Sequence, residues 1–251
     1  MHRSGPSEPI AVVPAAGLGT RLASGPYRGI LPKPMVPIAG SPLIRYAIRT
    51  AARLGARTVY VVLSPSDSLT GVYVQGLSIP RLRLKLAFQD RPSGLADAVS
   101  VVADNCSKWF YVVLGDDVTI ATNLSGLSRP IQMGSADAVQ ATVRDPNPLN
   151  IQAACGITFD KDRVVTSIEE KPQTSGFRYR GIGVYAFSQD LFKPAPLSRR
   201  DRRPTLEGIL ESLTSVRRFY AHPIRGLNFN VNYEVDRERA EKHLVLHRLQ
   251  F

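Results

Sequence analysis

The sequence predicts an α/β protein in which a mixed, mainly parallel central sheet lies between layers of helices. Short apolar runs typical of buried strands alternate with amphipathic helical patterns over roughly the first 120 residues. Beyond them, shorter strands separated by loops indicate an α+β portion on the same sheet. The chain has 251 residues, of which 43% are hydrophobic, so it can bury a large core.

Hydrophobic periodicity and flanking turn residues give the expected elements. Strands are expected at residues 10–13, 58–63, 82–88, 110–114, 138–143, 156–159, 164–169, 181–187, 216–222 and 227–231. Helices are expected at residues 95–103, 205–213 and 234–248. A further helix is expected to have Ser41 as its N-cap and Pro42 in its first position, and to run through Leu54 until Gly55 stops it.

The composition indicates a globular protein of the cytoplasm. No apolar run approaches the roughly 20 residues that span a bilayer, and residues 1–9 lack the apolar stretch of a signal peptide, so we expect a short disordered leader. The two cysteines are too few for a disulfide framework and fit free thiols in a reducing compartment. No linker divides the remaining residues 10–251, which are expected to form one domain.

The formal net charge of +11 suggests an anionic partner. The basic residues are scattered along the chain, and their densest cluster, at 199–203, fits a solvated loop. An anionic small molecule accounts for the excess at least as well as nucleic acid does, so neither nucleic acid nor a membrane is expected as a partner.

A loop with two glycines follows the first strand. Its sequence AAGLGTR, residues 15–21, is typical of backbone that surrounds phosphate oxygens. It is not a P-loop, which would end in Gly-Lys-Ser/Thr, and it is not a dinucleotide fingerprint, which would need a glycine where Leu22 stands. The segment LPKP, which contains Lys33, follows after a stretch rich in glycine and proline.

Four further segments carry polar residues at strand ends. They are FQDRPSGLADAV at 88–99, VVLGDDV at 112–118, SIEEKP at 167–172 with RGIGVYAF after it, and GLNFNVNYEVDRERA at 226–240. In the last segment, Asn228, Asn230 and Asn232 are two residues apart and would share one face of a strand. Together with AAGLGTRL and LPKP, these segments resemble the signature of the sugar-1-phosphate nucleotidylyltransferases, over roughly residues 10–240.

The resemblance implies a Rossmann-like three-layer nucleotidyltransferase fold and a defined reaction. Such enzymes join a nucleoside triphosphate to a sugar 1-phosphate and release pyrophosphate, and the present motifs are similar to those of members that use dTTP or UTP. It further implies a nucleotide-binding half at 10–120, a sugar-binding half at 121–232 and a C-terminal helix at 233–251.

The resemblance also assigns roles to residues of this chain. Arg21 would hold the departing pyrophosphate, and Lys33 would neutralise the reacting α-phosphate. Mg²⁺ would be held by Asp116 and by either Asn230 or Asn232. Nucleotide-binding roles fall to Ala15, Ala16, Gly17, Gly19, Thr20, Gln89 and Gly94. Sugar-phosphate-binding roles fall to Gly156, Glu170, Lys171 and Gly181.

Several alternatives stay open at this point. A cytidylyl- or adenylyltransferase is the second hypothesis, and a catalytically silent sensor of nucleotide sugars is the third. Residues 144–158 are about half a dozen residues longer than the similar segment of the family, which leaves the sugar open. Asp117 is either a functional carboxylate or a capping or surface residue. The sequence also leaves open whether the chain forms a homo-oligomer.

Overall fold

The computed structural model describes residues 8–17, 26–27, 29–90, 94–106, 108–173, 176–192 and 205–246. Three residues with predicted roles, Gly19, Thr20 and Arg21, lie outside these ranges, as do most of the expected leader and the basic cluster at 199–203.

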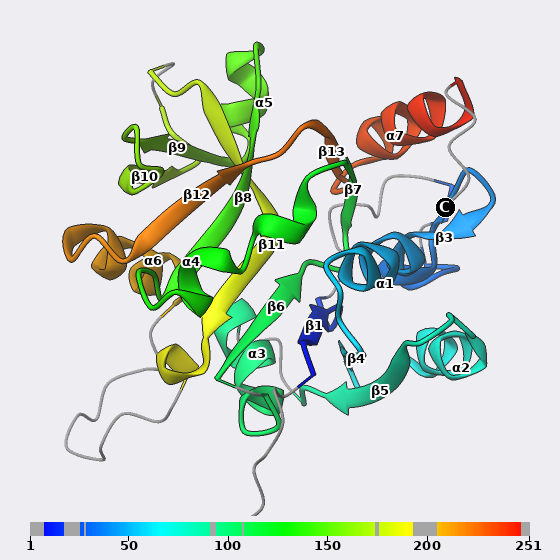
Figure 1. The fold of residues 1–251 in the computed structure, drawn as a ribbon. Helices are drawn as coiled ribbons and strands as arrows, with labels where there is room; N and C mark the ends of the chain where they lie inside the picture. Colours follow the sequence, from blue (N-terminus) through cyan, green and yellow to red (C-terminus); the bar gives the residue numbers. More distant parts are fainter. Residues whose placement is uncertain are drawn as a thin grey trace, which may run out of the picture.

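A mixed sheet of nine strands runs through this part of the chain (Figure 1). Its main path follows the order β10-β9-β11-β6-β1-β4-β5, and β8 joins it through β11 while β12 joins through β8. The strands are β1 (Ile10–Pro14), β4 (Thr58–Leu63), β5 (Arg83–Phe88), β6 (Trp109–Val113), β8 (Ala138–Arg144), β9 (Cys155–Phe159), β10 (Val165–Glu170), β11 (Tyr179–Ser188) and β12 (Phe219–Pro223).

Strand β11 joins the two halves of the chain. Strands β6, β1, β4 and β5 pair in parallel, whereas β11 is antiparallel to β6, β8 and β9. Because β11 is ten residues long, it pairs with the first half at one end and with β9 at the other. The predicted second portion therefore extends the same sheet rather than forming a separate one.

Helices and two small ribbons surround this sheet. The helices are α1 (Leu43–Arg53), α2 (Ser68–Gly76), α3 (Leu95–Ala103), α4 (Arg129–Gln132), α5 (Pro148–Gln152), α6 (Leu206–Ser215) and α7 (Glu234–Leu246). Short 3₁₀ turns occur at η2 (Lys33–Met35), η3 (Leu124–Gly126) and η4 (Gln189–Phe192). The ribbons pair β2 (Pro37–Ile38) with β3 (Ser41–Pro42), and β7 (Asp117–Ala121) with β13 (Gly226–Asn230).

Successive residues of the central strands enter two separate cores, because side chains alternate across a sheet. Val13 of β1 packs in the core under α1, which supplies Ile44 and Ile48. Val12 enters the core on the other face, where Val99 of α3 is buried and α6 contributes apolar side chains. A sheet with a helical layer on each face is the predicted α/β arrangement.

One local prediction was wrong, and one helix was not predicted. Ser41 does not cap α1: it lies in β3, Pro42 takes the N-cap position, and no side-chain hydrogen bond caps the helix. Helix α2 was not predicted, because its sequence SLTGVYVQG is rich in residues typical of strands. Asp67 starts this helix by accepting a 3.0 Å hydrogen bond from the Thr70 N–H, the usual N-cap interaction.

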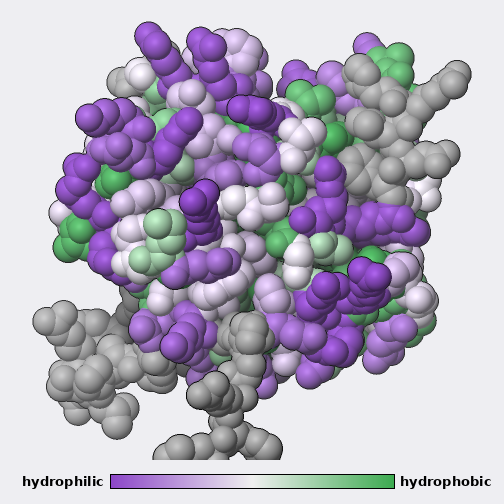
Figure 2. All heavy atoms as spheres, viewed as in Figure 1, coloured by the Kyte–Doolittle hydropathy of each residue, from purple (hydrophilic) through white to green (hydrophobic). Residues whose placement is uncertain are grey.

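The surface shown in Figure 2 is mostly hydrophilic, with apolar side chains in small separate groups. Within the described ranges, no helix combines the length and apolarity that crossing a membrane requires.

Candidate active site

The loops after β1 and β6 are held close together at one edge of the sheet. The Gly115 N–H donates to Pro14 O at 3.1 Å, and a Cβ at position 115 would lie 2.8 Å from that oxygen. Only glycine allows this approach without displacing the backbone. The Ala15 N–H also donates to Val62 O at 2.8 Å, which continues the pairing of β1 with β4 beyond the strand. Ala15, Ala16 and Gly17 therefore begin the loop beside the β6 end.

Three predicted residues from distant parts of the sequence meet at this edge. The Lys33 ammonium donates to Asp116 Oδ2 at 2.6 Å and to Asn232 Oδ1 at 2.9 Å. The amide of Asn232 in turn donates to Asn230 Oδ1 at 2.6 Å. The Lys33 and Asp116 side chains are 15% and 25% exposed, so solutes can still reach them. We call Lys33, Asp116, Asn230 and Asn232 the lysine cluster.

Both neighbours of the lysine position are prolines, and this fixes the backbone there. Pro32 is extended, with φ −63° and ψ 148°, and Pro34 occupies the first turn of η2. A proline fixes its own φ and disfavours the α region for the residue before it, so the two rings restrict the backbone torsion angles on both sides of Lys33. The lysine side chain consequently starts from a stiff turn.

Asp117 is fully buried, which excludes the surface aspartate that was one of the open alternatives. Burial raises the pKa of its carboxyl to about 7, and the charge of neighbouring Asp116 raises it further, while Asn228 and Arg180 act in the opposite direction. Neither carboxylate oxygen has a hydrogen bond of normal geometry to a described residue. A Cβ at Gly183 would overlap Asp117 Oδ2 and come within 2.6 Å of Leu114 Cγ, so the carboxyl fits only because position 183 is glycine.

A second charged cluster lies nearby in the interior. Arg180, at the start of β11, donates to Asn228 Oδ1 at 2.8 Å, to Asn228 O at 3.2 Å and to Asp145 Oδ2 at 3.3 Å. The Asn228 amide donates to Thr119 Oγ1 at 3.0 Å. We call Arg180, Asp145 and Asn228 the arginine cluster. Arg180 begins the segment RGIGVYAF and Asp145 lies in residues 144–158, but neither was given a role from the sequence. The expected common face of the three asparagines is divided between the two clusters.

Gln89 and Gly94 lie together, as the family resemblance requires. Gln89 is 6% exposed, and its amide donates to Gly94 O at 3.3 Å and to Asp97 Oδ2 at 3.0 Å. Gly94 has φ +105° and is the N-cap of α3, a conformation that favours glycine. Asp97 was not predicted, although a carboxylate in the first turn of a helix is a common capping signal.

The predicted sugar-phosphate residues lie on adjacent strands. Gly156 of β9 is opposite Glu169 of β10, and Gly181 of β11 is opposite Cys155 of β9. The Lys171 N–H donates to Ala154 O at 2.6 Å, with φ +49° at Lys171. The backbone therefore turns sharply where β10 ends.

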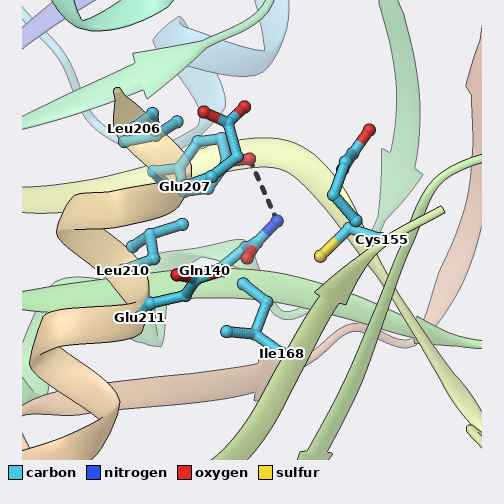
Figure 3. A pocket seen from close by; sticks show the side chains of 9 residues that line it. Gln140, Cys155, Ile168, Leu206, Glu207, Leu210 and Glu211 are labelled. Atoms are coloured by element: carbon cyan, nitrogen blue, oxygen red, sulfur yellow. Dashed lines mark hydrogen bonds between the residues drawn. The ribbon is translucent and has the colours of Figure 1, made fainter. Parts of the chain in front are cut away.

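A pocket of about 380 Å³, counted to its open mouth, lies between these strands and α6 (Figure 3). It is lined by Gln140, Cys155, Ile168, Glu170, Tyr185, Leu206, Glu207, Leu210 and Glu211. Glu170 belongs to it, whereas Gly156 faces the other side, where a Cβ would lie 2.5 Å from the Phe177 ring. We call this space the β10–α6 pocket.

Both cysteines are free, as predicted. Burial raises the pKa of the Cys155 thiol to about 12, helped by the charges of Glu170 and Glu207, and burial likewise raises the pKa of Cys106 to about 12. Both thiols are neutral at physiological pH and are therefore poor nucleophiles.

Comparisons with known proteins identify the family of the chain. A family model described as nucleotidyl transferase matches residues 10–222. A glucose-1-phosphate thymidylyltransferase of Mycolicibacterium smegmatis is 27% identical over 212 residues, which are 83% of this chain and 69% of the relative. A UTP–glucose-1-phosphate uridylyltransferase of Haloferax volcanii is 29% identical over 238 residues, which are 93% of this chain and 96% of the relative.

The fold has matches among solved structures. A UTP-bound UGPase from Acinetobacter baumannii has a TM-score of 0.81 at 19% identity, covering 97% of this chain and 95% of that one. At this identity the similarity shows the fold alone, and it confirms the predicted α/β class. The family match confirms the predicted kind of enzyme, a transferase of nucleotidyl groups. Since the family model spans most of the sequence, the chain belongs to the nucleotidyl transferase family.

Proposed function

We propose that this protein condenses dTTP or UTP with a sugar 1-phosphate to give a nucleotide sugar and pyrophosphate. The lysine cluster is the observation that carries the proposal, because Lys33, Asp116 and Asn232 converge from three distant segments on the edge where the β1 loop begins. Two relatives, a glucose-1-phosphate thymidylyltransferase and a UTP–glucose-1-phosphate uridylyltransferase, support both the donor and the acceptor class. Such an enzyme works in the cytoplasm, where nucleoside triphosphates are available.

Mg²⁺ fits the same cluster. One carboxylate oxygen and one amide oxygen already share a cation there, the Lys33 ammonium, at 2.6 and 2.9 Å. Carboxylate and amide oxygens are the donors that a hard divalent cation prefers. Asp116 and Asn232 would hold the metal, with Asn230 beside them, and substrate phosphates would complete its ligands. The bound ion would neutralise phosphate charge.

Lys33 and Arg21 are the cations that act on the phosphates. Lys33 would leave Asp116 and contact the α-phosphate, which lowers the charge that repels the incoming sugar phosphate. Arg21, in the loop that also contains Gly19 and Thr20, would hold the pyrophosphate as it departs. Contacts of this kind stabilise charge as it develops and are each worth on the order of 10²-fold in rate.

The nucleophile needs no general base from the protein. A sugar phosphate has a second pKa of roughly 6 and is mostly a dianion at neutral pH. Lys171 would hold this dianion, and Glu170 would accept hydrogen bonds from the sugar hydroxyls at the mouth of the β10–α6 pocket. Catalysis then consists mainly of positioning and electrostatic stabilisation.

Binding of the nucleobase is assigned to Gln89 and Gly94. Their 3.3 Å hydrogen bond places the Gln89 amide against the start of α3, where a pyrimidine could exchange hydrogen bonds with it. Ala15, Ala16 and Gly17 would supply backbone to the triphosphate. Gly156 and Gly181 would offer backbone to the sugar phosphate, because Phe177 and Gln140 fill the space beside their α-carbons.

A matrix of nucleoside triphosphates against sugar 1-phosphates, with Mg²⁺ and with pyrophosphate release as the readout, tests the proposal. We expect turnover with dTTP or UTP and at least one sugar 1-phosphate, and loss of turnover in Arg21→Ala with the fold intact. Turnover with CTP or ATP alone would correct the nucleotide. If no pair reacted while a nucleotide sugar raised the melting temperature, a sensor would replace the enzyme.

A further inference from the structure

The β10–α6 pocket is acidic within a basic protein. Three glutamates line it, Glu170 from the end of β10 and Glu207 and Glu211 from α6. None of the described residues that line it is a lysine, an arginine or a histidine. The whole chain carries 32 Lys and Arg against 21 Asp and Glu, so this local excess runs against the composition. Figure 3 shows the α6 residues Leu206, Glu207, Leu210 and Glu211 facing Gln140, Cys155 and Ile168 across the space.

Glu207 and Glu211 are exposed residues of α6, and only Glu207, in the first turn, has a role in the helix itself, because a carboxylate there favours the helix N-terminus. They are one helical turn apart, a spacing at which like charges weaken a helix. Neither side chain forms an ion pair or hydrogen bond with a described residue, although both lie on the side of α6 that borders the pocket. The helix is started instead by Thr205, whose hydroxyl accepts from the Gly208 N–H at 3.2 Å. Within the described part of the chain, the two carboxylates are thus without a partner.

Gln140 gives independent evidence that a ligand of this pocket carries hydrogen-bond donors. Its side chain is 2% exposed, and its amide nitrogen donates to the Tyr185 hydroxyl at 3.0 Å and to Ile182 O at 3.2 Å. Its oxygen, which is buried at the pocket, has no partner among the described residues. A buried acceptor without a donor is costly. Gly181 leaves the room for this amide, since a Cβ there would lie 2.5 Å from Gln140 Nε2.

The charges of Glu170 and Glu207 act on the same two buried side chains. Beside burial, the charges of Glu170 and Glu207 raise the pKa of the Cys155 thiol, and the same two charges contribute to the raised pKa of Tyr185. The carboxylates thus face a common space from opposite walls.

We propose that the β10–α6 pocket binds an amino group of the sugar, so that the substrate class is an amino-sugar 1-phosphate. This inference rests on the proposed function. An ammonium group brings three donors and one positive charge. It would donate to Gln140 Oε1 and offset the charges of Glu207 and Glu211. A hydroxyl brings one donor and no charge, and an N-acetyl group brings one donor and extra bulk.

A substrate panel with matched variants tests the proposal. Glucose 1-phosphates with a primary amine at each of positions 2, 3, 4 and 6 are compared with their hydroxyl and N-acetyl counterparts by kcat/KM for pyrophosphate release. We expect one amine to exceed both counterparts by about tenfold or more, since hydrogen bonds between charged groups are the stronger ones. The double variant Glu207→Gln/Glu211→Gln should remove this preference, so that the amine reacts no faster than its hydroxyl counterpart.

Glu169→Gln is the matched control. Glu169 precedes Glu170 on β10 but faces the side of Gly156, so its loss should leave the amine preference unchanged. The proposal is overturned if the hydroxyl or N-acetyl sugar reacts as fast as every amine and the double variant changes nothing; the proposed function then stands.

Calorimetric titration of the same sugar 1-phosphates separates the two proposals when no pair turns over. Binding of an amino-sugar 1-phosphate that weakens about tenfold in the double variant would support the pocket assignment while the transferase proposal fails. Equal binding of amine and hydroxyl sugars, or no binding of either, would overturn the pocket assignment.

Discussion

The lysine cluster and the arginine cluster contain similar kinds of residue but differ in how far they are buried. Each joins one cation, one aspartate and an asparagine from the β13 segment: Lys33 with Asp116 and Asn232, and Arg180 with Asp145 and Asn228. The Lys33 and Asp116 side chains are 15% and 25% exposed, whereas those of Arg180 and Asp145 are 9% and 10% exposed. The first cluster can exchange its partners for a ligand, while the second cannot.

The cations suit these two settings. A lysine ammonium is a compact charge on a flexible stem and can move from a carboxylate to a phosphate. The planar guanidinium of Arg180 spreads its donors in a rigid fork, which reaches both the side chain and the backbone oxygen of Asn228. The arginine cluster thereby ties β13 to β11, and the segment that follows β13 carries Asn232 to the lysine cluster.

Removing the buried cation should give the largest effect. Arg180→Ala removes the buried donor of Asn228 and the counter-charge of Asp145, which keeps hydrogen bonds from the Asn147 N–H and the Asn150 amide. We therefore expect the free energy of unfolding to fall by about 3 kcal/mol, the lower end for a broken buried pair. Urea denaturation measures this change. Arg178→Ala, two residues away and exposed, is the control and should change stability by less than about 0.5 kcal/mol. An equally small effect of Arg180→Ala would remove the distinction between the clusters.

Removing the exposed cation should affect catalysis rather than stability. For Lys33→Ala we expect kcat to fall on the order of 10²-fold, equivalent to about 2.7 kcal/mol, because the α-phosphate loses its counter-charge. The melting temperature should stay close to that of the wild type, since a partly exposed pair contributes little. Arg217→Ala breaks the exposed ion pair with Asp160 and serves as the control for losing a surface cation. Wild-type turnover in Lys33→Ala would contradict the proposed mechanism.

Asp117 lies between the clusters and should make stability depend on pH. Its carboxyl has a pKa of about 7 in the folded chain, against the ordinary aspartate pKa of 3.8, which we take for the unfolded chain. The folded state then holds the proton more tightly than the unfolded state, so stability falls as pH rises from about 4 to about 7. Between pH 5.5 and 8 the loss should be roughly 2 kcal/mol in metal-free protein.

The variant Asp117→Asn isolates this contribution. Urea denaturation at pH 5.5 and pH 8 should show the wild type losing stability at the higher pH and the variant losing less. The same pH dependence in both proteins would mean that Asp117 does not titrate in this range.

The lysine cluster was predictable from the sequence, and the arginine cluster was not. The resemblance of their motifs to one family assigned Lys33, Asp116 and either Asn230 or Asn232 to the same site. Of these, only Asp116 follows a parallel strand, β6, whose carboxyl end lies at the edge where ligands bind. Arg180 and Asp145 pair inside the protein through strand neighbours that no local pattern specifies. The same limit applies to Asp117, whose burial depends on the absence of a side chain at Gly183, 66 positions later in the chain.

The two asparagines beside Lys33 give the smallest and sharpest test. Asn232 accepts directly from the Lys33 ammonium, whereas Asn230 contacts it only through the Asn232 amide. If Mg²⁺ takes the position between Asp116 and Asn232, Asn232→Ala should raise the half-saturating Mg²⁺ concentration about tenfold, or about 1.4 kcal/mol. Asn230→Ala should raise it by less, because it removes only the group that orients Asn232. Pyrophosphate release at varied Mg²⁺ measures both values. A larger effect of Asn230→Ala than of Asn232→Ala would place the metal on Asn230 rather than on Asn232, the asparagine that contacts the Lys33 ammonium in this structure.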